Sequence, residues 1–272
     1  MRLDPPTSAS RNYKSVRSRS RLVLFAIIPC VIVAFAVAVA NADQSNTSAV
    51  VAIAQKYPSS KPLSEDPLIK NLHWMGLING RTNILRCACP VMDIAEEMES
   101  AKPTEHDLQL ARERMQHLRD LGIRTVISFQ HQDEDGDDDS NVEHRAVMLE
   151  RMAARDVGLV YVAFPMSNKG LHSFQDMSDD AVFRLLDPIS ADIFKFAENG
   201  GVAFHCKSGK DRTGIMAAYL RVKYQHWSAD EAIAEMRGYG HVWQNFAPNG
   251  ATNSWHENHV RAMAKVLNPA TP

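Results

Sequence analysis

Residues 205–214, with the sequence HCKSGKDRTG, constrain the fold of this chain more than any other segment. They follow the apolar residues 202–204 and precede the helix-like residues 215–224. This order predicts a strand, a tight loop and the N-terminus of a helix. Such a loop directs several backbone N–H groups at one point, and the helix dipole adds partial positive charge there. The sequence therefore predicts an oxyanion site with Cys206 at its floor.

The side chains of this loop suit an activated cysteine. Lys207, Lys210 and Arg212 lie close to Cys206 in the sequence. Cations and a helix N-terminus favour the thiolate form of a cysteine, which is the nucleophilic form. Five residues separate Cys206 from Arg212, which lets the guanidinium group return over the sulfur. Its planar fork matches two oxygens of a phosphoryl group.

The string HCKSGKDRTG resembles the signature of the cysteine-dependent protein tyrosine and dual-specificity phosphatases. Within them it is similar to the bacterial enzymes that carry GKDRTG and to phosphoinositide phosphatases with lysines in the loop. The ten residues carry the resemblance, and a supporting pattern extends from about residue 71 to about residue 243. The resemblance implies hydrolysis of phosphate monoesters through a phosphocysteine, without a metal or cofactor, because the loop supplies the positive charge.

The resemblance also implies roles for individual residues. Cys206 attacks phosphorus, while Arg212 and the loop amides stabilise the equatorial oxygens of the transition state. Thr213 donates a hydrogen bond to the sulfur and helps it leave. The expected substrate-binding residues are Lys207, Ser208, Gly209, Lys210, Asp211 and Arg212.

In related phosphatases an aspartic acid about thirty residues before the cysteine protonates the leaving oxygen and then activates water. Asp176 stands thirty residues before Cys206 and is the first candidate for this general acid. Asp211, inside the loop, is the second candidate, with bracing of the loop as its alternative role. Gln244 and Asn245 are candidates for positioning the hydrolytic water.

The substrate class stays open between alternatives. Phosphotyrosine in proteins, with phosphoserine and phosphothreonine as further candidates, is the first interpretation. Lys207 and Lys210 raise the local potential beyond what one phosphate needs, which indicates phosphoinositides or inositol phosphates as an alternative. A second alternative is a phosphate-binding module without turnover.

The N-terminus has the pattern of an export segment. Six basic residues and one acidic residue occupy positions 1–21, and residues 22–40 carry no charge. Ala40-Asn41-Ala42 follows, which is the small-residue spacing of a signal-peptidase site. Nineteen apolar residues are also long enough for an uncleaved membrane anchor. Both interpretations place the catalytic domain outside the cytoplasm, in the periplasm, secreted or tethered to the membrane.

These patterns divide the chain into a signal peptide or membrane anchor at 1–42, a linker at 43–66 and a phosphatase domain at 67–272. Without residues 1–21, the chain has 24 basic and 31 acidic side chains, a net charge of −7. An acidic domain without a basic stripe is not expected to bind nucleic acid. The acidic run at 133–139 lacks the final glutamate of a calcium-binding loop and is interpreted as a solvated loop.

The cysteines do not form a disulfide framework, since Cys87 and Cys89 are too close in sequence for an ordinary bridge with each other. One hypothesis is that Cys87 or Cys89 forms a reversible disulfide with Cys206 and shields it from over-oxidation.

The fold class expected is α/β, with a central, largely parallel sheet flanked by helices and an apolar N-terminal helix. We expect short strands within 72–85 and strands at 123–129, 159–164 and 202–205. The helices are expected at 104–121, 142–156, 178–198 (with a break near Pro188), 212–225, 228–237 and 255–267. The loop that holds Cys206 should lie at the carboxyl edge of the sheet, where such sheets bind ligands.

Overall fold

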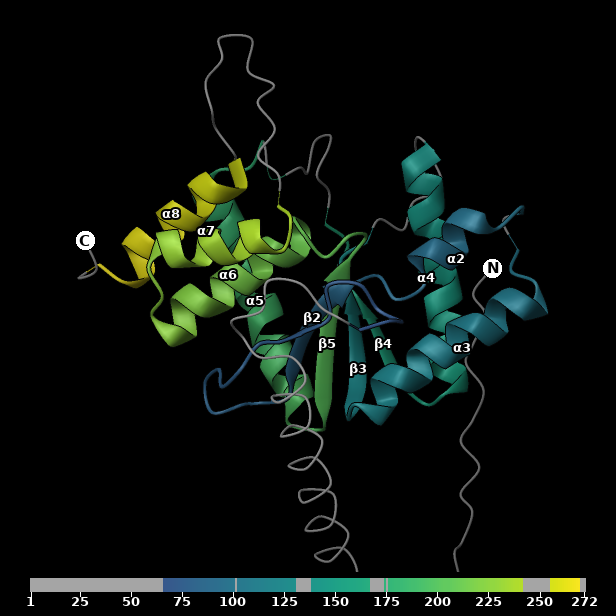
Figure 1. Cartoon of the computed structure of the whole chain (residues 1–272). Helices are drawn as coiled ribbons and strands as arrows, with labels where there is room; N and C mark the ends of the chain where they lie inside the picture. Colours follow the sequence, from purple (N-terminus) through teal and green to yellow (C-terminus); the bar gives the residue numbers. More distant parts are fainter. Residues whose placement is uncertain are drawn as a thin grey trace, which may run out of the picture. The chain divides into compact units, whose positions relative to one another are not determined.

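The computed structural model describes residues 66–100, 102–130, 138–166, 174, 176–241 and 255–269, all within the unit Gln44–Pro272 (Figure 1). The expected signal or anchor at 1–42, with its apolar helix, lies outside the described residues, as do the linker up to residue 65 and the acidic residues 133–137. No helix within the described ranges combines the length and the apolar character that a bilayer crossing requires.

The sheet has five strands in the order β1-β2-β5-β3-β4. Their bounds are β1 His73–Trp74, β2 Ile84–Ala88, β3 Ile123–Ser128, β4 Val160–Ala163 and β5 Gly201–Cys206. Only the short β1 is antiparallel to its neighbour, and the other pairs are parallel. This confirms the predicted largely parallel sheet. Because β5 is central, the residues that follow it lie between the ends of β2 and β3.

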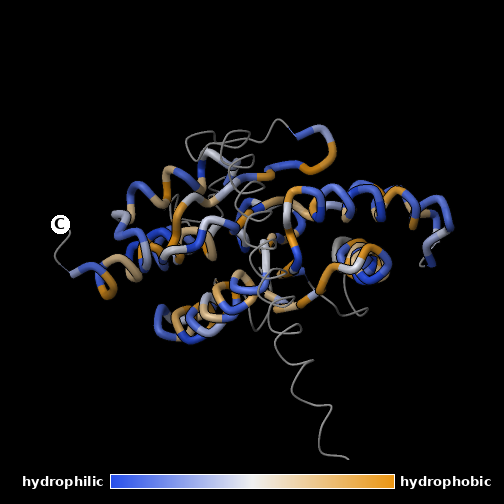
Figure 2. The backbone as a smooth tube through the Cα atoms, turned by 90° about the horizontal axis from the view of Figure 1, so that it is seen from below, coloured by the Kyte–Doolittle hydropathy of each residue, from blue (hydrophilic) through white to orange (hydrophobic). Residues whose placement is uncertain are grey.

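Two layers of helices cover the sheet (Figure 1). One face carries α2 Met92–Glu97, α3 Glu105–Asp120 and α4 Asp138–Asp156. The other carries α5 Asp179–Ala197, α6 Arg212–Gln225, α7 Ala229–Gly238 and α8 Trp255–Leu267. Along the helices, hydrophobic and hydrophilic stretches alternate, as expected for helices with one buried face (Figure 2).

The central strand is buried on both faces, and its side chains alternate between the two layers. Val202, Phe204 and Cys206 belong to the core beneath α5–α8, whereas Ala203 belongs to the core beneath α2–α4. A parallel strand covered on both faces needs apolar residues at consecutive positions, which explains the continuous apolar run before the loop.

Capping residues define the helix ends that the sequence predicts. Thr104 caps α3, and its hydroxyl and the Asp107 carboxylate form the reciprocal bonds of a capping box. Gly122 follows α3 with φ +88°, the left-handed conformation that ends helices. Ser228 caps α7 with a capping box, and Ser178 caps α5 through its side chain alone.

Two features differ from the expectations. Helix α5 continues through Pro188 without the predicted break. Proline removes the N–H donor that would bond to the carbonyl four residues earlier, yet the helix continues, and the Ser190 hydroxyl donates to the Asp187 carbonyl at 2.6 Å. The short helix α2 was not predicted, because six residues are too few for a clear helical period.

Candidate active site

Residues 207–211 connect β5 to α6 and form the predicted loop at the carboxyl edge of the sheet. Three consecutive carbonyls of this loop accept hydrogen bonds from groups outside it. The Cys89 backbone N–H donates to the Lys207 carbonyl at 3.1 Å. Asn71 Nδ2 donates to the Ser208 carbonyl at 2.8 Å, and Arg86 Nη2 donates to the Gly209 carbonyl at 2.9 Å.

These bonds matter for anion binding because a peptide group has opposite ends. A carbonyl that is held outward leaves the N–H of the same peptide plane directed the other way. Fixing three successive carbonyls on the outside therefore favours amides that converge on the inside, where an oxyanion is stabilised without reorganisation.

Gly209 meets a strict steric requirement. Its φ is +71°, and a Cβ at this position would lie 2.6 Å from the Cys87 carbonyl oxygen and 2.7 Å from the Ala88 backbone nitrogen. Both atoms belong to β2, so they cannot move without disturbing the sheet. The loop can approach the end of β2 this closely only with glycine at this position.

Arg212 begins α6, and a buried carboxylate fixes its orientation. Its Nη1 and Nη2 donate to the two oxygens of Glu143, at 2.9 and 2.5 Å. Nη1 also lies 3.2 Å from the carbonyls of Phe129 and Met166, which follow β3 and β4. Burial lowers the pKa of Arg212, but the hydrogen bonds to Glu143 and nearby negative charges outweigh it and raise that pKa.

The guanidinium group keeps its Nε side for a ligand. Among the described residues, Arg212 Nε has no hydrogen-bond partner although it is buried, and Nη2 bonds to Glu143 through only one of its two N–H groups. A planar fork held along one edge by Glu143 presents its other edge in a fixed direction, which suits it to the oxygens of a phosphoryl group.

Cys206 is the last residue of β5 and is almost fully buried beside the loop. Thr213 is also buried, and in the described part of the chain its hydroxyl has no hydrogen-bond partner. The predicted bond from this hydroxyl to the sulfur is therefore not formed in this structure.

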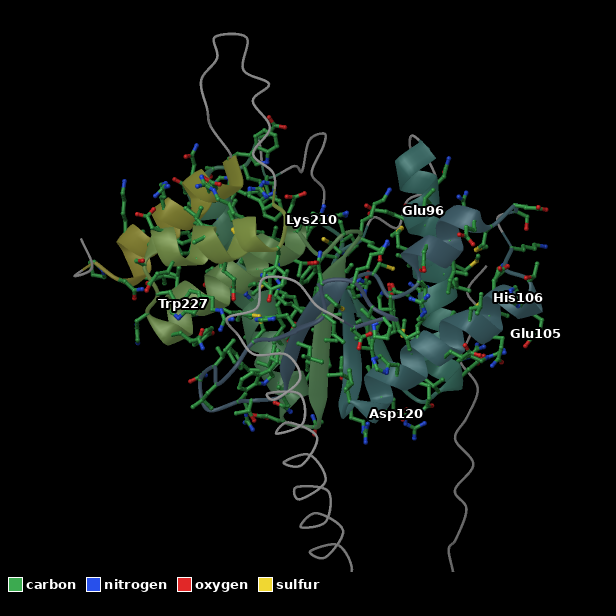
Figure 3. All side chains as sticks on the ribbon, in the orientation of Figure 1. Glu96, Glu105, His106, Asp120, Lys210 and Trp227 are labelled. Atoms are coloured by element: carbon green, nitrogen blue, oxygen red, sulfur yellow. The ribbon has the colours of Figure 1, made fainter. Side chains whose placement is uncertain are left out.

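The two loop lysines have different surroundings. Lys207 Nζ lies 3.8 Å from Glu96 of α2. Lys210 packs along the backbone of Gly240, after α7. Figure 3 shows Lys210 and Glu96 at the same edge of the sheet, with Glu96 on the side of α2 and α4. One of the two added positive charges is therefore partly offset by a carboxylate.

Asp211 faces a group of histidines that follow α7 and begin α8. Its Oδ1 lies 2.5 Å from His241 Nδ1. The ring of His256 packs between His241 and Phe174, with both ring centroids 5.4 Å away. Burial would raise the pKa of Asp211, but the hydrogen bond to His241 and the charges of His256, His241 and Arg212 lower it. The structure therefore favours the carboxylate form of Asp211.

Asp176 is exposed and lies in the turn before α5. The neighbouring Phe174 contacts the histidine group, since its carbonyl lies 2.7 Å from His259 Nε2. Asp179 and Asp180 lie in the first turn of α5, as their position after the cap Ser178 predicts. Gln244 and Asn245 lie outside the described residues.

The structure argues against a disulfide between Cys206 and either neighbouring thiol. Cys87 and Cys89 belong to the core beneath α2–α4, whereas Cys206 belongs to the core beneath α5–α8. Cys87 pairs in register with His205 and Ala88 with Cys206. A bridge to Cys206 would require one strand to turn over within the sheet.

Sequence reasoning missed three residues that hold this loop: Asn71, Arg86 and Glu143. Arg86 is fully buried, stacks on Tyr239 at 4.0 Å and lies 3.7 Å from Glu235, which also pairs with the buried Arg221. A charged residue inside the apolar run 84–88 was the available signal for Arg86. The sequence feature that could have identified Glu143 was a carboxylate on the apolar stripe of α4. No sequence feature pointed to Asn71.

Comparison with known proteins agrees with this geometry. Residues 105–223 match the model of the tyrosine phosphatase family, which covers α3 through most of α6 and includes the loop. This stretch is similar to the tyrosine phosphatase family, and the match spans less than half of the chain. The match agrees with the resemblance to cysteine-dependent tyrosine and dual-specificity phosphatases that the loop sequence predicts. No curated protein matches the chain by sequence.

This chain is similar to several solved structures of phosphatases. TpbA of P. aeruginosa is 18% identical, with 74% of this chain and 94% of that chain covered and a TM-score of 0.38. The kinase associated phosphatase KAP is 14% identical, with 77% and 100% covered and a TM-score of 0.43. The core catalytic domain of the PP-IP phosphatase SIW14 of S. cerevisiae is 14% identical, with 70% and 83% covered and a TM-score of 0.33.

The close approach of Gly209 to β2 leads to a first prediction. We expect Gly209→Ala to reduce phosphatase activity by about 10²-fold or more, because the added Cβ displaces the loop amides from the oxyanion. Hydrolysis of para-nitrophenyl phosphate measures this. Gly80→Ala is the matched control, since Gly80 also has positive φ but has no atom within 4 Å of an added Cβ. Equal activity of the two variants would contradict the steric argument.

A second prediction concerns stability and pH. Burial, followed by the charges of His241 and His259, lowers the pKa of His256 to about 4 although Asp211 opposes the shift. Between pH 6.5 and about 4 the unfolded chain therefore binds a proton at His256 that the folded chain does not. Stability falls as the pH drops through this window, by up to about 3 kcal/mol.

Urea unfolding at several pH values measures the effect of His256. The free energy of unfolding of the wild type and that of His256→Gln should become more similar as the pH is lowered from 7 towards 4. Only the wild type has a histidine at position 256 that takes up a proton on unfolding in this range. Parallel stability curves for the two proteins would show that His256 titrates normally.

Proposed function

We propose that this phosphatase hydrolyses phosphotyrosine in proteins, with phosphoserine and phosphothreonine as further substrates, through a phosphocysteine on Cys206. One observation carries the proposal: a buried cysteine lies at the floor of a loop whose carbonyls are held outward and whose arginine is fixed by Glu143. A nucleophile, converging amides and a fixed guanidinium are the groups that phosphoryl transfer needs.

In this mechanism the sulfur of Cys206 attacks phosphorus, and the bond to the leaving oxygen breaks. Arg212 Nε and the loop amides bind the equatorial oxygens. Asp176 gives a proton to the leaving oxygen and then takes one from the water that attacks the phosphocysteine. Thr213 donates to the sulfur when the second step releases it.

The assignment of Asp176 as the acid rests on charge. A group that protonates a leaving oxygen must hold a proton when substrate binds. Asp211 lies among His241, His256 and Arg212, and its lowered pKa disfavours the protonated form. Asp176 is exposed and lies outside the loop, so we assign bracing of the loop to Asp211 and proton transfer to Asp176.

The surroundings of the lysines support a substrate with one phosphate. Glu96 beside Lys207 offsets part of the positive charge that a second phosphate group would use. Lys210 remains as an added cation, and this favours phosphoinositides or inositol phosphates as the second candidate. Side-by-side kinetics on phosphotyrosine peptides, phosphoinositides and inositol phosphates distinguish the two candidates by kcat/KM.

We also propose that the enzyme works outside the cytoplasm, either in the periplasm, or secreted, or anchored in the membrane with its catalytic domain outside the cytoplasm. The proposal rests on the basic residues before position 22, the uncharged residues 22–40 and the site at 40–42. N-terminal sequencing of the mature protein tests it: a chain that begins at Asp43 indicates cleavage, and a chain that begins at Met1 in the membrane fraction indicates an anchor.

The central test removes the nucleophile. We expect Cys206→Ser to lower hydrolysis of para-nitrophenyl phosphate by about 10⁴-fold or more while the substrate still binds, because the hydroxyl is not activated by this loop. Cys87→Ser, a buried thiol on the other face of the sheet, is the control. Rapid acid quench with labelled substrate should trap phosphate on wild type alone. Turnover in Cys206→Ser would refute the mechanism, and a wild type without turnover would indicate a binding module.

The two acid candidates are separated by leaving-group dependence. Asp176→Asn should lower turnover of phenyl phosphate by about 10²–10⁴-fold. The loss with para-nitrophenyl phosphate should be smaller, since this leaving group needs less protonation. The fall in rate at alkaline pH should also disappear. If Asp211→Asn shows this pattern and Asp176→Asn does not, the roles are reversed.

A further inference from the structure

A second group of polar side chains lies behind the loop, on the face of the sheet that α2–α4 cover. Cys89 follows β2, Glu150 belongs to α4 and His205 belongs to β5. Cys89 Sγ, one nitrogen of His205 and one carboxylate oxygen of Glu150 all lie within 4.8 Å of one another. Cys89 is 6% exposed, and the other two residues are 0% exposed.

The polar atoms of this group are not satisfied by the protein around them. His205 Nε2 lies 3.0 Å from Glu150 Oε1, but the pair does not have hydrogen-bond geometry. Within the described ranges, both carboxylate oxygens of Glu150 and Nε2 of His205 are buried without a hydrogen-bond partner. A buried carboxylate without hydrogen bonds is strongly unfavourable. Even an ion pair with a protonated His205 would leave these three atoms without hydrogen bonds, which favours an additional positive partner.

We propose that Cys89, Glu150 and His205 bind one divalent transition-metal ion, with zinc as the best fit, in a buried site behind the loop. A thiolate and a carboxylate carry two negative charges and a neutral imidazole carries none, so a divalent ion makes the buried group neutral. Zinc takes sulfur, nitrogen and carboxylate ligands, whereas magnesium and calcium prefer oxygen alone. Binding forms the zinc–sulfur bond and releases the thiol proton of Cys89 to solvent.

This group lies beside the segments that support the loop 207–211 and does not face the side of the loop where substrate would bind. His205 directly precedes Cys206, and the backbone N–H of Cys89 donates to the Lys207 carbonyl. Glu150 lies seven residues after Glu143, which places both on one face of α4. A metal ion here would join the ends of β2 and β5 to α4, the helix whose Glu143 binds the guanidinium group of Arg212.

The test uses the full chain with Cys206→Ser as background, so that the loop thiol cannot bind metal. The protein is produced with added zinc and purified without chelators or a histidine tag. We expect about one zinc ion per chain by elemental analysis. Replacement by Co²⁺ should give the charge-transfer band of a cobalt–thiolate bond.

Variants assign the ligands. Cys89→Ser and Glu150→Gln should each lose the bound zinc, and Cys89→Ser should lose the cobalt–thiolate band. Cys87→Ser is the matched control because Cys87 is an equally buried thiol of the same core outside the group. It should keep both signals. Loss of the band in Cys87→Ser, or its persistence in Cys89→Ser, would overturn the assignment.

A measurement on the chain with wild-type ligands does not depend on the folding of variants. Zinc should raise its unfolding temperature, and a chelator added before refolding should lower it, because the ion binds the folded state alone. If this chain contains no zinc and unfolds at the same temperature with and without Zn²⁺, the proposal is wrong. Glu150 and His205 are then an ion pair. None of these readouts depends on phosphatase activity.

Discussion

The active site depends on the outward fixation of three loop carbonyls. Amides that point into a small loop repel one another and would turn to water if the chain were free. Asn71, Arg86 and the backbone of Cys89 prevent this by binding the carbonyls from behind. The donors lie in or beside β2, so the pairing of β2 with β5 sets the shape of the anion site. Preorganised dipoles of this kind stabilise developing charge without reorganisation.

The second constraint is the burial of charge around that loop. Arg86, Arg221 and Glu235 form one buried group under the loop, and Arg212 with Glu143 forms another beside it. Buried ion pairs contribute little net stability, because desolvation offsets most of their attraction. They set directions in the site: Glu143 leaves the Nε side of Arg212 free for a ligand, and Arg86 holds Gly209 where the steric limit of β2 requires it.

Local patterns predicted much of the fold. The caps Thr104, Ser178 and Ser228 and the apolar runs of the parallel strands each act within a few residues, so the sequence displays them directly. The support of the loop was not predictable in this way. Asn71 and Arg86 lie more than a hundred residues from the carbonyls that they bind, and Glu143 lies 69 residues from Arg212. Only the assembled sheet and the packing of α4 bring them together, and the local sequence pattern contains no sign of such contacts.

The charge of the loop also explains why proton transfer should come from outside it. Positive charges that favour an oxyanion also lower the pKa of a carboxyl group beside them: burial would raise the pKa of Asp211, but His241, His256 and Arg212 lower it. An acid that must be protonated before the first step and ionised before the second is better placed at the edge of this field. Asp176 is exposed and belongs to the turn that leads into α5 rather than to the loop. The position of the two aspartates relative to the anion site is therefore the basis on which we propose different roles for them.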